Sequence, residues 1–138
     1  MDLAHLWFNF KGRINRAKYW LVLLVSSAIF VTAILIAVAA QSWALGVLAG
    51  LLAIPSLASS LAVAVKRLHD REKSAWWLSV FYLLPALLDG MANVAGDASL
   101  VFSLASFGIS LWALVELGCL RGTMGDNQYG PDPLAGRG

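Results

Sequence analysis

Four long apolar stretches alternate with short polar segments along the chain, at about residues 20–40, 45–65, 75–94 and 99–120. A helix rises about 1.5 Å per residue, so about twenty apolar residues cross a hydrocarbon core about 30 Å thick. Four such stretches joined by short connections are typical of a helical membrane protein. We therefore predict a single all-α domain over residues 1–138, an integral membrane bundle of four transmembrane helices.

The third stretch is the shortest. Its uncharged run covers residues 75–88 and contains Pro85, a length that fits a re-entrant or interfacial segment as well as a span continuing through Asp89 to Val94. Basic residues favour the span. With four crossings and both termini in the cytoplasm, all ten Lys and Arg are cytoplasmic, as the positive-inside rule requires. The cytoplasmic segments are then residues 1–19, 66–74 and 121–138.

Composition agrees with a membrane location. Hydrophobic residues make up 59% of the chain and charged residues 13%, about half the charged share of a soluble domain. The first apolar stretch is too long for a signal peptide, so we interpret it as an uncleaved span. Cys119 is the single cysteine, which excludes an internal disulfide and a zinc or redox motif built on cysteines. We expect no cofactor, no metal and no nucleic-acid partner.

Two small-residue patterns predict close helix contacts within the membrane. Gly46 and Gly50 have the spacing that lets two helices approach closely, within this chain or in a homo-oligomer. The fourth stretch carries small residues at alternating steps of four and three, which favours tight packing, with a water-lined path as the alternative. These are Ser99, Ser103, Ser106, Ser110 and Ala113.

Glu116 is an acidic residue near the cytoplasmic end of the fourth stretch. An acidic residue in a span is costly and requires a partner. We expect a structural ion pair with Arg121 or with a basic residue of the first two cytoplasmic segments. The alternative is a proton or ion site.

Three polar segments should meet at the cytoplasmic face: residues 7–20, 66–77 and 121–133. Arg13 and Arg16 would share a face if both lay on a helix. The third segment is rich in Gly, Asn, Asp and Pro, which predicts a folded loop rather than a helix.

The same three segments carry specific motifs. They are GRIN-R-x-x-YW at residues 12–20, KRLHDR-x-K-S-x-WW at 66–77 and G-x-N-x-YGPDP at 125–133. In these motifs the chain resembles the domain of unknown function 805 family, small bacterial inner-membrane proteins. The resemblance covers nearly the whole chain and implies a multi-span protein of the bacterial inner membrane, with no established activity.

We expect the motif residues to form one polar cluster. One interpretation is an ion-paired group in which Asp70, Asp126 or Asp132 pairs with arginines and fixes the helix ends. The other is a site for an anionic lipid headgroup or a small phosphorylated ligand, because arginine binds phosphate in a bidentate manner and the aromatic residues suit headgroup depth. The candidate ligand-binding residues are Arg13, Asn15, Arg16, Lys66, Arg67, His69, Asp70, Trp76, Trp77, Asn127 and Tyr129.

His69 and Asp70 do not form a convincing catalytic pair. Neighbouring residues on a helix point about 100° apart, so a carboxylate for His69 would come from Asp126 or Asp132 instead. We predict that the protein is not an enzyme. A further alternative is an oligomeric ion or small-solute transport component that uses Glu116 and the serine stripe.

Overall fold

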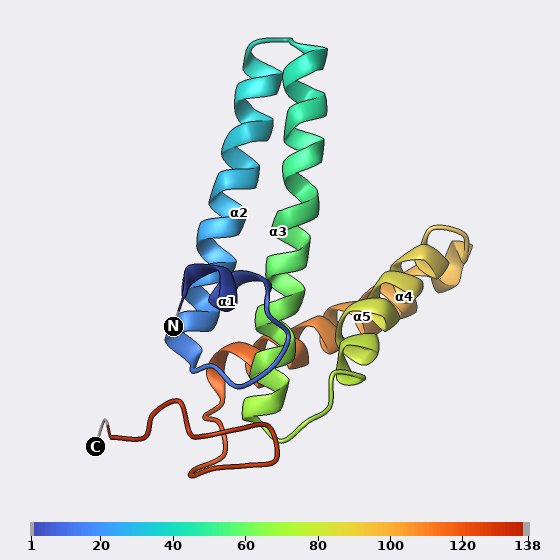
Figure 1. Ribbon diagram of the computed structural model, residues 1–138. Coiled ribbons are helices and arrows are strands. Elements are labelled where there is room, and N and C mark those ends of the chain that lie inside the picture. Colours follow the sequence, from blue (N-terminus) through green and yellow to red (C-terminus); the bar gives the residue numbers. More distant parts are fainter. Residues whose placement is uncertain (1, 137–138) are drawn as a thin grey trace.

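The computed structural model describes residues 2–136, and within this range the secondary structure is helical apart from one isolated β-bridge between Asn127 and Gly130 (Figure 1). The predicted all-α class is therefore confirmed. Arg137, one of the ten basic residues counted above, lies outside the described residues. The elements are α1 (Leu3–Phe8), α2 (Arg16–Ala39), α3 (Trp43–Asp70), the π-helix η1 (Ser79–Leu83), α4 (Leu84–Ala92), the 3₁₀-helix η2 (Gly96–Ala98), α5 (Ser99–Leu114) and the π-helix η3 (Val115–Cys119).

Helices α2 and α3 form a long antiparallel hairpin. Asn15 caps α2, because its side chain accepts a hydrogen bond from the backbone N–H of Lys18. The hairpin turn places Gln41 at a φ of +49°, and Ser42 then caps α3 in the same way. Helix α3 continues through Pro55 and ends only at Asp70. Residues 66–70, expected in a cytoplasmic connection, therefore form the last turn of the helix.

The third apolar stretch is broken into two elements. It begins as the π-helix η1 and continues as α4, and the resulting apolar helix Ser79–Ala92 is shorter than each of the three candidate membrane spans. Those three are Arg16–Ala39, Trp43–Asp70 and Gly96–Cys119, each long and apolar enough to cross a membrane. Full crossing by the third stretch stays a prediction, as does the cytoplasmic location of both termini.

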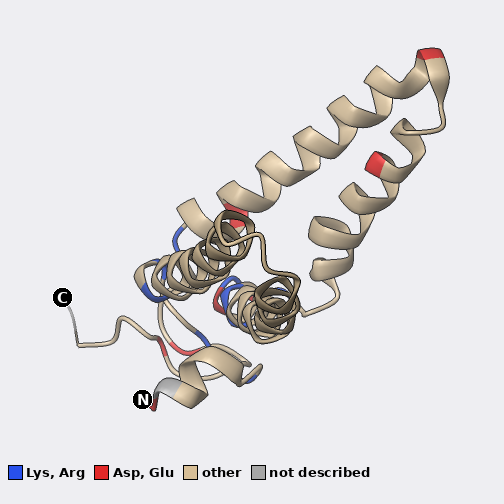
Figure 2. Cartoon of the chain, turned by 90° about the horizontal axis from the view of Figure 1, so that it is seen from above, with Lys and Arg blue, Asp and Glu red and all other residues tan. Residues whose placement is uncertain are grey.

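Helices α4 and α5 form a second, shorter hairpin that diverges from the first (Figures 1 and 2). The four helices are thus arranged as two hairpins joined at one end, rather than as four helices packed side by side along their length. Where the hairpins meet, the buried side chains include Val22, Leu68, Phe81 and Leu117. This junction also carries the loop before α2, the connection between α3 and η1 and the segment after η3, so it positions the polar residues described below.

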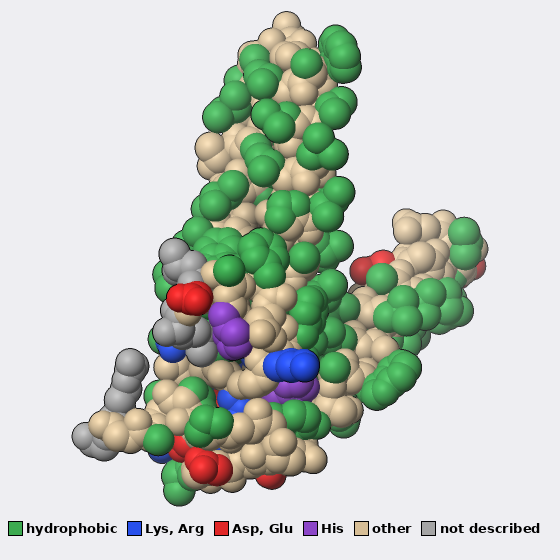
Figure 3. Space-filling model, in the orientation of Figure 1, with side chains coloured by type: hydrophobic (Ala, Val, Ile, Leu, Met, Phe, Trp, Pro, Cys, Tyr) green, Lys and Arg blue, Asp and Glu red, His purple; other side chains and the backbone are tan. Residues whose placement is uncertain are grey.

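The outer surfaces of α2, α3 and α5 are covered by apolar side chains, as Figure 3 shows for one face. Gly46 and Gly50 are also on the outside, where an added Cβ would meet nothing within 4 Å. They therefore do not mediate packing within this chain, and a homo-oligomer through them stays a prediction.

The serine stripe of α5 contributes to the second hairpin. Ser106 is buried, and its hydroxyl donates to the Pro85 carbonyl on the helix before it at 3.2 Å. Ala113 is buried as well, while Ser110 lines a pocket between the hairpins. The predicted packing role is therefore confirmed at Ser106 and Ala113.

Candidate functional site

Asp70, the last residue of α3, is the centre of a buried ion-pair group. Its Oδ1 accepts from Arg13 Nε at 3.0 Å, and its Oδ2 accepts from Arg67 Nη1. The side chains of Asp70, Arg13 and Arg67 are at most 4% exposed. We call the residues around this group the polar cluster; it consists of residues 12–16, 66–73 and 116–132.

Arg67 also binds backbone carbonyls at the end of the chain's last helix. Its Nε donates to Leu117 at 2.8 Å and its Nη2 to Leu120 at 2.7 Å, while Nη1 reaches Ile14 at 3.3 Å. The last carbonyls of a helix have no intrahelical partner and carry partial negative charge, so a cation is favourable there. Arg67 therefore joins α3, η3 and the segment before α2.

Arg13 binds backbone carbonyls of the C-terminal loop in the same way. Its guanidinium donates to the carbonyls of Thr123 and Gly125, both at 2.7 Å, and to that of Gly130 at 3.3 Å. The expectation that Arg13 and Arg16 share a helix face was wrong. Asn15 has an extended backbone as the N-cap, so α2 begins only at Arg16 and Arg13 lies in the preceding loop.

Lys66 fixes the N-terminal helix α1. Its buried ammonium group donates to the carbonyls of His5, at 3.1 Å, and Leu6. These are carbonyls near the end of a six-residue helix, where a cation is again favourable. Lys66 is thus committed to backbone carbonyls and is not available for a ligand.

His69 stacks on Tyr129, with ring centroids 4.0 Å apart and planes at 5°. Its Nδ1 lies 3.2 Å from the carbonyl oxygen of Gly12, which can only accept, so Nδ1 carries the hydrogen. The amide of Asn127 donates to the His69 carbonyl at 3.0 Å and so holds the C-terminal loop on α3.

No carboxylate orients His69 in the part of the chain that is described, so neither Asp126 nor Asp132 takes the position that a catalytic His69 would require. The two carboxylates accept backbone N–H groups within their own loop instead, from Asp132 and Gly125 respectively. Short loops rich in Asp form such turns readily. Among residues 2–136 they do not pair with arginines either, and of the three expected acids Asp70 is the one that does so there.

Glu116 is buried and accepts from Arg71 Nε at 3.0 Å, with Lys73 Nζ at 3.8 Å. The partner comes from residues 66–74, the second of the segments predicted to be cytoplasmic and one of the two expected sources. Arg121 contributes only its carbonyl, which accepts from Arg71. This arrangement is the structural ion pair rather than an open ion site.

Trp76 and Trp77 lie outside the ion-pair group centred on Asp70. Trp76 is 82% exposed. Trp77 packs at the base of the second hairpin against Phe81 and Trp112, and the Lys73 ammonium lies 4.2 Å from the centroid of its ring. Both tryptophans therefore suit an interfacial position and not a shared pocket with the arginines.

Sequence reasoning missed two glycines that the polar cluster requires. A Cβ on Gly118 would stand 2.6 Å from the Trp20 ring, whose Nε1 donates to the Gly118 carbonyl at 3.0 Å. A Cβ on Gly122 would collide with Asp70. Both residues have ordinary backbone conformations, so a single sequence carries no signal for them.

One part of the polar cluster is open. A pocket of about 350 Å³ lies at the start of α2. The exposed guanidinium of Arg16 donates to the Cys119 carbonyl at 2.7 Å. Arg121 is exposed, and its guanidinium has no hydrogen-bond partner among residues 2–136. The pocket is lined by Asn15, Arg16, Ala17, Arg67, Asp70, Arg121, Gly122 and Leu134.

The family described as "Protein of unknown function (DUF805)" matches residues 7–131. The chain belongs to this family. The match includes the first two motif-bearing segments and the third as far as Pro131. The predicted resemblance is therefore confirmed.

Three relatives from Escherichia coli K12 cover most of the chain. Inner membrane protein YhaH is 28% identical over 91% of this chain and 87% of its own length. The uncharacterized protein YiiR is 31% identical over 96% and 90%, and inner membrane protein YhaI 28% over 93% and 88%. No solved structure matches. The names of YhaH and YhaI agree with the apolar helices described above.

Proposed function

We propose that this DUF805 protein is a non-catalytic, multi-span protein of the bacterial inner membrane that binds the phosphate group of an anionic phospholipid. The binding site is the pocket beside α2, with Arg16 and Arg121 as the residues that contact the phosphate. The observation that carries the proposal is the presence of two exposed guanidinium groups on one pocket at the end of the apolar helices.

The arginines of the polar cluster divide into two kinds. Arg13 and Arg67 are buried, and carbonyls and Asp70 accept their hydrogen bonds, so they have little capacity left for a ligand. Arg16 and Arg121 are exposed. Of the arginines predicted to bind a ligand, this division leaves Arg16, and it adds Arg121, which was not among them. A phosphate can reach both without breaking the ion-pair group.

The surroundings favour an anion. The pocket lies at the N-terminus of α2, where the helix dipole adds partial positive charge. Asp70, the one acidic residue in the lining, is neutralised by Arg13 and Arg67. Guanidinium groups bind phosphate oxygens through paired hydrogen bonds. The net charge offered to a ligand is therefore positive.

The depth of the site favours a lipid as the source of the phosphate. Arg16 is the first residue of a candidate span, and Trp20, one turn further along, donates to the chain's last helix. A basic residue next to the membrane contributes about 1 kcal/mol toward an anionic surface. A headgroup at the end of α2 would meet both arginines while its acyl chains lie along the apolar helices.

Native mass spectrometry of the purified protein tests this proposal. We expect retained phosphatidylglycerol or cardiolipin, with retention reduced at least fivefold in Arg16→Ala and in Arg121→Ala. Lys11→Ala is the matched control, because Lys11 is an exposed basic residue outside this pocket. Soluble glycerol phosphate is the second arm, and we expect it to compete weakly.

Two results would contradict the proposal. Equal retention in the two arginine variants and in Lys11→Ala would leave the polar cluster as a structural ion-pair group only. Full competition by glycerol phosphate at equal concentration would show that a free phosphorylated ligand, and not a lipid, is bound.

A further inference from the structure

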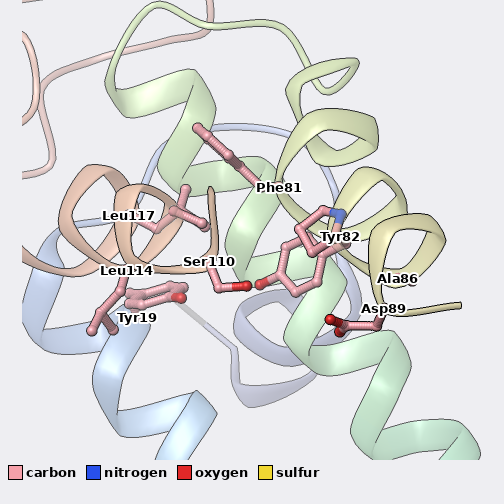
Figure 4. A pocket seen from close by; sticks show the side chains of 10 residues that line it. Tyr19, Phe81, Tyr82, Ala86, Asp89, Ser110, Leu114 and Leu117 are labelled. Atoms are coloured by element: carbon pink, nitrogen blue, oxygen red, sulfur yellow. The ribbon is translucent and has the colours of Figure 1, made fainter. Parts of the chain in front are cut away.

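A second pocket, of about 400 Å³, lies between the two hairpins (Figure 4). Apolar side chains form most of its wall, including the buried Phe81 and Leu117. Four residues bring polar groups to it: Tyr19 from α2, Tyr82 and Asp89 from the third apolar stretch, and Ser110 from α5. Its size lies in the usual range for small-molecule sites, about 300–1,000 Å³.

Asp89 is the single charged residue that lines this pocket. Figure 4 shows its carboxylate and the hydroxyls of Tyr82 and Ser110 pointing toward one another across the space. No described residue donates to the Asp89 carboxylate or pairs with it, and the ion pairs of residues 2–136 lie in and beside the polar cluster. Asp89 is exposed at this open pocket, so a ligand can reach its carboxylate, and a carboxylate beside apolar side chains favours a cationic partner.

The wall also supplies aromatic faces. Tyr19, Phe81 and Tyr82 line the pocket, and an aromatic face attracts a cation that lies within about 6 Å of its centroid. Three aromatic rings and one carboxylate suit an organic cation better than a metal ion. A metal ion prefers several oxygen, nitrogen or sulfur ligands. Among the described residues no group of three His, Cys, Asp or Glu side chains could hold a metal ion.

We propose that the pocket between the hairpins binds a lipophilic organic cation, with Asp89 as its counter-charge and the rings of Tyr19 and Tyr82 against its face. The site is distinct from the pocket at Arg16 and Arg121, which attracts the opposite charge. The two proposals therefore stand or fall separately.

Two ions of the same shape and opposite charge test this site: tetraphenylphosphonium and tetraphenylborate. Isothermal titration calorimetry of the protein in nanodiscs, with empty nanodiscs as the reference, measures both. We expect saturable binding of tetraphenylphosphonium only. Asp89→Asn, which keeps the shape and removes the charge, should weaken that binding at least tenfold.

Asp97→Asn is the matched control, because it removes one negative charge from the exposed turn outside the pocket. It should bind tetraphenylphosphonium like the unchanged protein. Tyr82→Phe should also bind normally since it keeps the ring, whereas Tyr82→Ala should bind several-fold more weakly.

Ser110→Leu provides a second route, in which an added side chain fills the pocket without changing charge, and we expect it to abolish binding. Absence of saturable tetraphenylphosphonium binding in the unchanged protein would overturn the proposal. Equal losses in Asp89→Asn and Asp97→Asn, or normal binding by Ser110→Leu, would overturn it as well.

Discussion

Gly122 lies against the carboxylate of Asp70, so closely that a Cβ on Gly122 would stand 1.9 Å from Oδ2 and 2.3 Å from Cγ. Neither atom can move away freely, because Arg13 and Arg67 hold the carboxylate from two directions. The smallest side chain is therefore already too large at this position.

We predict that Gly122→Ala destabilises the protein by about 3–5 kcal/mol, the cost of breaking a buried ion pair. Thermal unfolding in detergent measures the loss. Gly108→Ala is the control, since a Cβ there meets nothing within 4 Å and alanine favours a helix. A Gly122→Ala protein as stable as Gly108→Ala would show that the carboxylate can be displaced at little cost.

Asp70→Asn should also lower stability, again by about 3–5 kcal/mol, because it leaves two buried guanidinium groups without a counter-charge. Asp126→Asn, at an exposed acid whose side chain accepts only a backbone N–H, should change stability by less than about 1 kcal/mol. Denaturant unfolding monitored by tryptophan fluorescence compares the two. Equal effects would remove Asp70 from the centre of the polar cluster.

The C-terminal loop should respond to acid through Asp132. Backbone hydrogen bonds from Leu134 and Gly125 hold the pKa of this carboxyl below its usual range. A lowered pKa in the folded state means that the stabilisation is complete above the ordinary aspartate pKa of about 3.9. It is lost as pH falls through the lower folded value.

Backbone amide chemical shifts of Gly125 and Leu134 measure this transition. We expect both to titrate together with a midpoint below the ordinary value, and to show no such transition in Asp132→Asn. A midpoint at or above about 3.9 would mean that the two hydrogen bonds do not form in solution.

The crossing of the third apolar stretch can be tested at Val94, which is 85% exposed beyond the end of α4. In a Cys119→Ser background, we expect Val94→Cys to react with a membrane-impermeant maleimide added to intact cells. Met124→Cys, on the opposite side in a four-span topology and 75% exposed, should react only after permeabilisation. In intact cells, labelling of Met124→Cys but not of Val94→Cys would show that the stretch re-enters without crossing, because α5 would then carry Met124 to the outside.

The sequence sufficed to predict those parts of the fold that depend on local pattern. Long apolar runs predict helices wherever the backbone must satisfy its own hydrogen bonds, and α2, α3 and α5 follow them. The Arg67–Asp70 ion pair was also predictable, because residues three apart on a helix share a face.

The arrangement of the hairpins was not predictable in this way. In a membrane protein the outward face is as apolar as the core, so the pattern does not say which faces of α4 and α5 meet α2 and α3. The π-helical start of the third stretch has no signal in composition either.

The different roles of the arginines could not be predicted from the sequence either. Arg13 and Arg16 look equivalent in the motif, yet the cap at Asn15 places one in a buried loop and the other on the exposed start of a helix. Only the positions of distant carbonyls, such as those of Thr123 and Cys119, decide which arginine is free.

The contacts of Arg13 imply an order of events during biosynthesis. Its carbonyl partners at Thr123 and Gly125 lie 110 and 112 residues further along the chain, so they leave the ribosome after all of the apolar stretches have been made. Until then Asp70 is the one partner described above that this guanidinium can reach. Insertion of the helices therefore precedes formation of the contacts between Arg13 and the C-terminal loop. A chain that stops before Thr123 can insert its helices but cannot form these contacts.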